Sequence, residues 1–190
     1  MKTLNIKKIT GIIFFIFHFS FFITLKAQID AGKKAMCNSY MKSTYIFEGK
    51  VDSSKYITIK TGQYTYYNYT VYFMEVNKVI KGDIQKGTIE IEQAADGITY
   101  KSPDHTESLH SDDGSPPPPN QGLYFCSNKA GKPLHYQNSN AKSLHFYDGE
   151  SVTNGMIKKW QRGTGLSEYF PTVAEFYAYI SENYGIKIEN

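Results

Sequence analysis

The stretch from Tyr64 to Gln93 constrains the fold of this chain more than any other, because its pattern predicts two long strands joined by a turn. Aromatic and apolar residues alternate with smaller or polar ones over residues 67–73, which is the period of a strand that buries one face. From Met74 onward the phase of the alternation switches. One extra residue near 73–75, a β-bulge, would cause this switch and bend the strand. Strands that curl into a small barrel need such bends, so we expect a barrel, with a flat hairpin as the alternative.

Shorter runs extend this β-rich pattern on both sides. Residues 88–92 alternate with isoleucines on one face and acids on the other, and further strands are predicted at residues 45–51, 57–59, 122–126 and 143–147. Gly49 has no side chain to pack, so it marks a tight bend or a close backbone approach. The predicted fold class is therefore mainly β, a small barrel with flanking helices.

Two helices are expected to flank the sheet. Near the N-terminus, Asp30 can cap a short helix that places Cys37 on its buried side. At the other end, Thr172 begins a capping box for an amphipathic helix over residues 172–184, and Gly185 stops it. Apolar residues recur on one face of this last helix, so it must dock on another element, most simply the sheet.

The first 27 residues have the features of a secretory signal peptide. A basic start is followed by an apolar run of about 15 residues and by the small residue Ala27, after which cleavage is expected. An uncleaved membrane anchor is the alternative, but the run is shorter than the ~20 apolar residues of a spanning helix and contains His18 and Ser20. We therefore expect one exported domain over residues 28–190, secreted, periplasmic or at the cell surface, with no stable membrane span after cleavage.

Removal of the signal peptide changes the charge balance. The whole chain has 21 Lys and Arg against 18 Asp and Glu, a net charge of +3. Four of the lysines and none of the acids lie in residues 1–27, so the exported chain carries −1. A nucleic-acid partner is not expected, because binding to phosphates needs a net positive surface.

Two cysteines remain after cleavage, Cys37 and Cys126. In an exported chain such a pair predicts a disulfide, which would close a segment of about 90 residues and contribute on the order of 4 kcal/mol. Two buried free thiols are the alternative, because Cys126 lies in an apolar strand, where Cys serves as a small hydrophobe. A catalytic cysteine is not expected, for want of a histidine in a recognisable pattern.

Residues 94–120 break the strand pattern. They contain few apolar residues and a run of prolines that favours polyproline II, so we expect a long loop, either a binding loop or a mobile insertion. Residues of this loop that could bind a metal or transfer protons are His105, Glu107, His110, Asp112 and Asp113. Their spacing fits neither a helical zinc site nor a calcium loop, so a solvated acidic loop without a cofactor is expected.

The middle of the chain carries three motifs and a flanking cysteine that suggest a family. The motifs are IFEGKV (46–51), YTVYFMEVNKVIKGDIQKGTIEIEQ (69–93) and GLYFCSN (122–128), preceded by a cysteine shortly after the signal peptide. Through them, roughly residues 35–130 resemble the netrin-module and tissue-inhibitor-of-metalloproteinase group, especially its members in secreted bacterial proteins. The resemblance implies an OB-like barrel stapled by a disulfide between the two cysteines.

The resemblance also implies an activity, inhibition of metalloproteases, in which an N-terminal Cys places its amine and carbonyl on the catalytic zinc. This chain departs from that pattern. Cys37 lies nine residues after Gln28, and Ser39 stands where the family has a second Cys. We therefore take over the barrel and the disulfide and keep inhibition as an alternative.

The function expected from the sequence is that of a non-enzymatic binding module. Its partner is an extracellular or envelope protein or glycan, which contacts the 94–120 loop or outward tyrosines such as Tyr64 and Tyr66. A metal-dependent hydrolase using the cluster at residues 105–113 is the other alternative, but nothing in the pattern positions a nucleophile.

Overall fold

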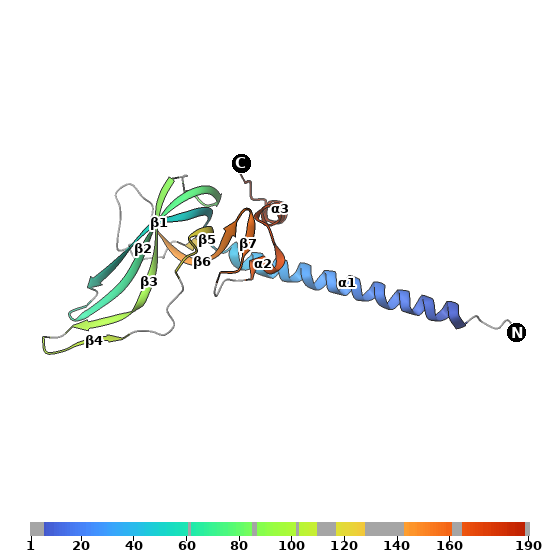
Figure 1. Ribbon diagram of the computed structural model, residues 1–190, viewed down its shortest axis with the longest axis horizontal. Coiled ribbons are helices and arrows are strands. Elements are labelled where there is room, and N and C mark those ends of the chain that lie inside the picture. Colours follow the sequence, from blue (N-terminus) through green and yellow to red (C-terminus); the bar gives the residue numbers. More distant parts are fainter. Residues whose placement is uncertain are drawn as a thin grey trace. The chain divides into compact units, whose positions relative to one another are not determined.

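The computed structural model describes residues 6–60, 62–84, 87–101, 103–109, 117–127, 143–160 and 165–188. Two compact units divide the chain after Ser39. The first unit contains helix α1 except for its last residue, Tyr40. The second unit contains Tyr40, the sheet and the remaining helices. The elements in chain order are α1 (Ile6–Tyr40), β1 (Tyr45–Lys60), β2 (Thr65–Lys81), β3 (Gly87–Lys101), β4 (Thr106–Leu109), β5 (Gln121–Ser127), β6 (Ser143–Thr153), β7 (Met156–Lys158), α2 (Leu166–Tyr169) and α3 (Val173–Tyr184) (Figure 1).

Helix α1 is continuous through Ala27, the predicted cleavage position. Residues 6–40 contain no proline, the residue that most strongly interrupts a helix. In the full chain Asp30 lies inside a helix that begins at Ile6, so the helix start at Asp30 that is expected after cleavage stays a prediction. Cleavage after Ala27 stays a prediction. Among the described residues, no helix combines the length and the apolar character needed to cross a membrane.

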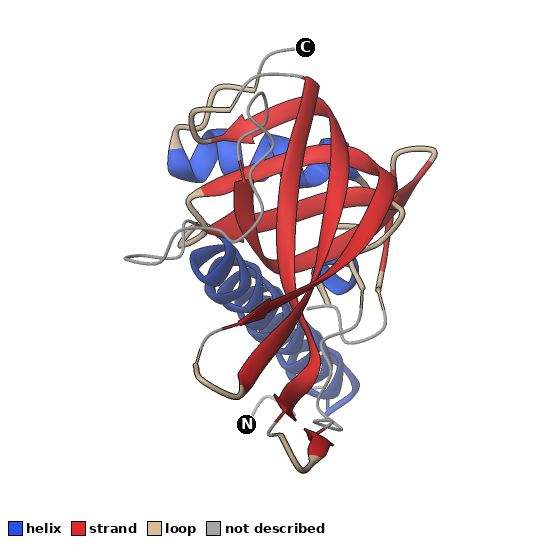
Figure 2. Cartoon of the chain, turned by 90° about the vertical axis from the view of Figure 1, so that its left-hand side faces the viewer, coloured by secondary structure: helices blue, strands red, loops and turns tan. Residues whose placement is uncertain are grey.

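The second unit is built around a seven-stranded sheet with the order β4-β3-β2-β1-β5-β6-β7, in which all neighbours are antiparallel. One additional, parallel pairing joins Glu90–Glu92 of β3 to Ser143–His145 of β6. Strands β3, β2, β1, β5 and β6 therefore form a closed ring. Figure 2 shows these strands curving around a common centre. A mainly β fold with a strongly curled sheet and flanking helices is thus confirmed.

Irregular pairing between β1 and β2 accounts for much of this curvature. One register shift lies between Val51 and Ser53, with Asp52 as the extra residue on β1, and it faces residues 73–74 of β2. The bulge expected near 73–75 is therefore at the predicted place in the strand pair, but the extra residue belongs to the partner strand. Bulged strands bend and twist more strongly than regular ones.

Burial on β2 changes phase at this position, as predicted. Val71 is buried before the shift, and Met74, Val76 and Ile80 are buried after it. A further register shift follows at Gly49 of β1, where a Cβ atom would come within 2.5 Å of the Glu75 carbonyl oxygen. The close backbone approach expected at Gly49 is confirmed.

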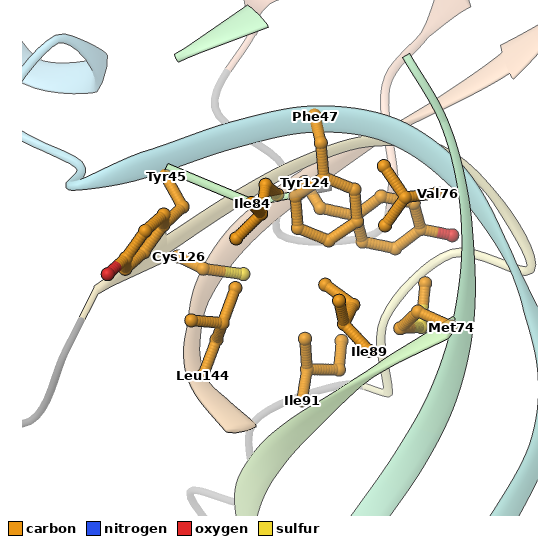
Figure 3. Close-up of a cluster of buried hydrophobic side chains, with 10 residues drawn as sticks. All are labelled: Tyr45, Phe47, Met74, Val76, Ile84, Ile89, Ile91, Tyr124, Cys126 and Leu144. Atoms are coloured by element: carbon orange, nitrogen blue, oxygen red, sulfur yellow. The ribbon is translucent and has the colours of Figure 1, made fainter. Parts of the chain in front are cut away.

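The interior of the ring is filled by side chains from all five of its strands. Phe47 of β1 and Tyr124 of β5 stack with ring centroids 5.2 Å apart and are both fully buried. Because a large apolar side chain contributes about 1.5–3 kcal/mol when it is fully buried, this cluster dominates the stability of the unit. Its members are Tyr45, Phe47, Met74, Val76, Ile84, Ile89, Ile91, Tyr124, Cys126 and Leu144 (Figure 3).

The outer face of the ring is also covered at β1 and β5. Ile46 and Phe125 lie opposite each other in the pairing of these strands, and both are fully buried. The ring of Tyr40 lies 4.2 Å from that of Phe125, centroid to centroid. Strands buried on both faces carry continuous apolar runs instead of a clean alternation, which is the pattern of residues 45–47 and 123–126.

Helix α3 begins and ends as its sequence predicts. The Thr172 hydroxyl oxygen accepts a hydrogen bond from the Glu175 N–H at 3.2 Å, and Gly185 stops the helix in the left-handed region with φ 65°. Phe176 and Ile180 are fully buried on its inner face. The helix docks on the sheet through Tyr177, as described below.

Beyond the ring, the chain continues as an extension that we call the arm: residues 53–60 of β1, 65–72 of β2, 94–101 of β3, and β4 (Figure 1). Strands β3 and β4 form a hairpin in which Ile98 pairs with Leu109 and Lys101 pairs with Thr106. The expected loop over residues 94–120 is therefore wrong for residues 94–101 and 106–109. The short β-forming run at residues 98–100 is stabilised by pairing with β2. Such a tertiary contact is not visible in the local sequence pattern.

Candidate functional site

The β1 part of the arm is much more exposed than the ring. On β1 all side chains from Asp52 to Tyr56 are exposed, and Tyr56 keeps 59% of its surface accessible. Tyr64, at the turn between β1 and β2, is 40% exposed. Tyrosines held on strands offer a large contact area at a low cost in conformational entropy. The arm is therefore the candidate binding surface.

Three residues lie where β2 begins and β3 ends: Tyr64, Tyr66 and Lys101, which we call the tyrosine–lysine patch. The Lys101 Nζ lies 5.3 Å from the centre of the Tyr66 ring, within the range of a cation–π contact. The Lys101 N–H donates to the Tyr64 carbonyl at 2.8 Å, and the Gln63 side-chain amide donates to the Tyr64 hydroxyl at 3.1 Å. Lys101, which we did not predict, thus contacts both predicted tyrosines: the ring of Tyr66 and the backbone of Tyr64.

Polar contacts within the arm hold this patch in place. The Gly62 N–H donates to the Thr65 carbonyl at 3.3 Å and closes the turn between β1 and β2. Further along the same strand pair, the Thr58 hydroxyl donates to Asn68 Oδ1 at 2.9 Å, and Asn68 is only 7% exposed. A surface whose backbone is already ordered loses little entropy when it binds.

The acidic cluster expected at residues 105–113 is described only in part. His105 is exposed just before β4, and Glu107 lies on β4, where it pairs with Tyr100. His110, Asp112 and Asp113 lie outside the described residues. Within the part of the chain that is described, no group of three His, Cys, Asp or Glu side chains is placed to hold a metal ion.

The other end of the predicted loop is fixed to the ring. Pro118 and Pro119 are buried, and the Tyr124 hydroxyl donates to the Pro119 carbonyl. The Trp160 Nε1–H donates to the Pro117 carbonyl at 2.9 Å. Pro118 and Pro119 therefore serve the packing of the ring and do not form part of an exposed binding loop.

The two cysteines are not bonded to each other, so the expected disulfide is corrected to two buried free thiols. Cys126 packs as a small hydrophobe in the ring interior, and Figure 3 shows its sulfur pointing into the cluster. Burial raises the pKa of the Cys37 thiol to about 11, against a smaller opposing effect of Lys33, and burial also raises the pKa of Cys126. Both thiols are therefore protonated at neutral pH and are poor nucleophiles.

Two acids on β6 were not predicted, and they have a structural explanation. Glu150 is fully buried, and its Oε1 accepts a hydrogen bond from the Leu166 N–H at 3.0 Å, which fixes the start of α2 to the ring. Asp148 accepts a hydrogen bond from the Gly149 N–H at 2.8 Å. Partial burial raises the Asp148 pKa to about 6; the Gly149 hydrogen bond lowers it, and the neighbouring Glu150 charge raises it further.

Comparison with known proteins adds no relative to this picture. No family model, no curated protein and no solved structure matches the chain. The site is therefore argued from the chemistry of its own residues.

Proposed function

We propose that this chain is an exported, non-enzymatic binding module that holds a partner protein on the tyrosine–lysine patch of its arm. One observation carries the proposal: Tyr64 and Tyr66 lie beside Lys101 on a sheet extension whose far end is anchored in a packed ring. Rigid aromatic side chains combined with a positive charge are typical of residues that dominate binding energy at protein interfaces.

The order of the strands supports an OB-like barrel. OB-folds are five-stranded, partly open Greek-key barrels that bind ligands on a strand face and adjoining loops. In this chain one parallel pairing, between β3 and β6, closes five strands into a ring, which supports this assignment. Membership of the netrin-module and metalloproteinase-inhibitor group remains our proposal, and it rests on this order together with the motifs at residues 46–51 and 69–93.

The charge of the patch favours an acidic protein surface as the partner. Lys60 lies directly opposite Tyr66 in the β1–β2 pairing, so a second lysine flanks the aromatic pair together with Lys101. Residues directly opposite each other in an antiparallel pair share a face of the sheet. The raised pKa values of both thiols and the packing role of Glu150 support a non-enzymatic role.

The experiment is capture from the native envelope or culture medium. Immobilised wild-type protein is compared with the double variant Tyr64→Ala plus Tyr66→Ala, and we expect the variant to bind the captured partner about 10- to 30-fold more weakly, the loss typical of interface hot spots. Protease treatment of the captured fraction should abolish binding, whereas glycosidase treatment should leave it intact. Binding that survives protease and is lost with glycosidase would replace the protein partner by a glycan.

The matched control is Tyr147→Ala. Tyr147 is 62% exposed on β6, outside the arm. Its substitution therefore removes an exposed tyrosine without changing the patch. Equal losses in the patch variant and in this control would contradict the proposal. Higher salt should weaken wild-type binding, because the lysine charges are solvent-exposed and screened.

A further inference from the structure

Within the described part of the chain, strand β1 has a long edge in the arm that no other strand pairs with. Its first part, Tyr45–Lys50, pairs with β5 on one side and with β2 on the other. The Val51 N–H still donates to the Asn120 carbonyl at 2.7 Å. From Asp52 to Lys60, the described pairings of β1 are with β2 alone. An edge strand of this length is a template for pairing with another strand.

The other edge of the arm is different. It is formed by β4, which spans only Thr106–Leu109. Very short edge strands are one of the ways in which proteins avoid pairing at an edge. The β1 edge does carry the lysines that protect edges, Lys55 and Lys60, so its partner must be one that accommodates them.

We propose that the partner of this edge is a second copy of the same chain, paired antiparallel through residues 52–60 about a two-fold axis at Tyr56. In this register Tyr56 faces its own copy, Ser54 faces Thr58, and Asp52 faces Lys60 of the other copy at both ends. Opposite charges and aromatic pairs placed directly across an antiparallel pair are stabilising. A two-fold interface of this kind uses the same surface on both copies and closes as a dimer.

The charges of the edge select this register over its neighbours. Moving the axis to Lys55 would place Lys55 against its own copy, which brings like charges together, and would place Lys60 opposite Lys50, a position already paired with β5. Moving it to Ile57 would place Lys60 against Ser54 and leave Asp52 outside the pairing. Asp52 lies at the β1 bulge, so the long Lys60 side chain reaches it at the end of the regular run of pairs.

Charge reversal tests the register. We expect the purified, full-length protein to form a concentration-dependent dimer in sedimentation experiments. Asp52→Lys and Lys60→Asp should each weaken dimerisation about tenfold, because each creates two like-charged pairs. The double variant restores two opposite pairs and should return the dimer to within about twofold of wild type.

Cross-linking gives a second, independent readout. Tyr56→Cys places two thiols across the axis, at a separation that a disulfide can span. Mild oxidation should therefore link this variant into covalent dimers. Ser53→Cys is the matched control: it lies opposite residue 59, so its own copy is roughly 20 Å away along the strand, and it should not cross-link.

Several outcomes would overturn the inference. These are a protein that stays monomeric at millimolar concentration, a double charge variant as weak as the single ones, or equal cross-linking at residues 53 and 56. The result is separable from the proposed function through Asp52→Lys and Tyr56→Cys, which leave Tyr64, Tyr66, Lys101 and the flanking Lys60 unchanged. A wild-type protein that stays monomeric but still captures its partner would refute the dimer edge and leave the proposed function standing.

Discussion

The ring and the arm are built from the same strands, yet they differ in what their side chains do. In the ring, β1 is buried on both faces, with Phe47 inside and Ile46 outside, both at 0% exposure. In the arm, the same strand exposes Tyr56 to 59%. The bulge at Asp52 lies at the junction between the two regions. Strand β1 therefore passes from the buried core of the ring to the exposed surface of the arm within a few residues.

This difference indicates that the ring provides the stability of the unit and that the arm provides its binding surface. The ring contains the interdigitated apolar cluster, so substitutions there should act on the free energy of unfolding. The side chains from Asp52 to Tyr56 in the arm are exposed, so substitutions there should act on binding and leave folding nearly unchanged. Each prediction below either sharpens this contrast or would remove it.

The largest effect is expected for Phe47→Ala. The phenyl ring is fully buried and stacks on Tyr124, so its removal should cost about 3–5 kcal/mol of unfolding free energy. Tyr56→Ala, on the same strand in the arm, should change it by less than about 0.5 kcal/mol. Urea denaturation measures both. Similar losses at the two positions would show that the arm belongs to the cooperative core.

The second prediction concerns backbone packing. A Cβ atom on Gly122 would overlap the Glu150 carbonyl oxygen and lie 3.2 Å from Pro119 Cγ, so Gly122→Ala should destabilise the ring by about 1–3 kcal/mol. In the arm, a Cβ on Gly62 would lie 3.3 Å from the Thr65 hydroxyl oxygen, and Gly62→Ala should be nearly neutral. Thermal unfolding of the two variants decides whether tight backbone contacts are confined to the ring.

The fold was predictable where local patterns decide it. Alternation and the phase switch after Phe73 located β2 and its bend, and the caps at Thr172 and Gly185 located α3. The β3–β4 hairpin was missed, because its few β-forming residues are stabilised by pairing with β2 and not by their own pattern. The helix start expected at Asp30 applies to the cleaved chain; in the full chain the segment before Asp30 is itself helical.

The candidate site was predictable only in part. Outward tyrosines on a strand suggested Tyr64 and Tyr66, but Lys101 belongs to a strand far along the chain, and only the register of β2 with β3 brings it to Tyr66. The disulfide was expected from the number of cysteines in an exported chain. That number carries no information about their burial. In the structure Cys126 is a core residue of the ring, a role that its apolar neighbours had suggested as the alternative.

The third prediction tests how α3 is held on the ring. The Tyr177 hydroxyl donates to Glu48 Oε2 at 2.7 Å, and burial and this bond raise the pKa of Tyr177. Tyr177→Phe leaves the half-buried Glu48 carboxylate without this donor and should cost about 1–2 kcal/mol. Tyr147→Phe, at a 62% exposed position, is the control and should be neutral in denaturant titration. Equal effects would mean that the hydroxyl contributes nothing to docking.

The fourth prediction is a pH dependence located in the ring. The Asp148 pKa is raised to about 6 by burial, above the ~3.9 of an unfolded chain. The folded state thus binds more protons between these values, so Asp148 makes stability fall as pH rises from about 4 to 6. Since the group is partly exposed, we expect a change of about 1 kcal/mol. Asp148→Asn should reduce this pH dependence, measured as the difference in unfolding free energy between denaturation curves at pH 4.5 and 7.5. An unchanged difference would assign the pH dependence to other groups.

The smallest effect on folding is expected at Lys101, and it gives the contrast its sharpest test. The Lys101 ammonium group contacts the Tyr66 ring at 5.3 Å on an exposed surface, and such contacts contribute about 0.5–1 kcal/mol. Lys101→Gln should therefore lower stability by no more than about 0.5–1 kcal/mol, close to the neutral result expected for Lys158→Gln at an exposed position on β7. Partner capture by Lys101→Gln should nevertheless fall and become less salt-dependent, because the removed charge faces the partner and not the core. Capture that is unchanged in this variant would make Lys101 an element of arm structure alone and would leave the two tyrosines as the only binding side chains of the patch.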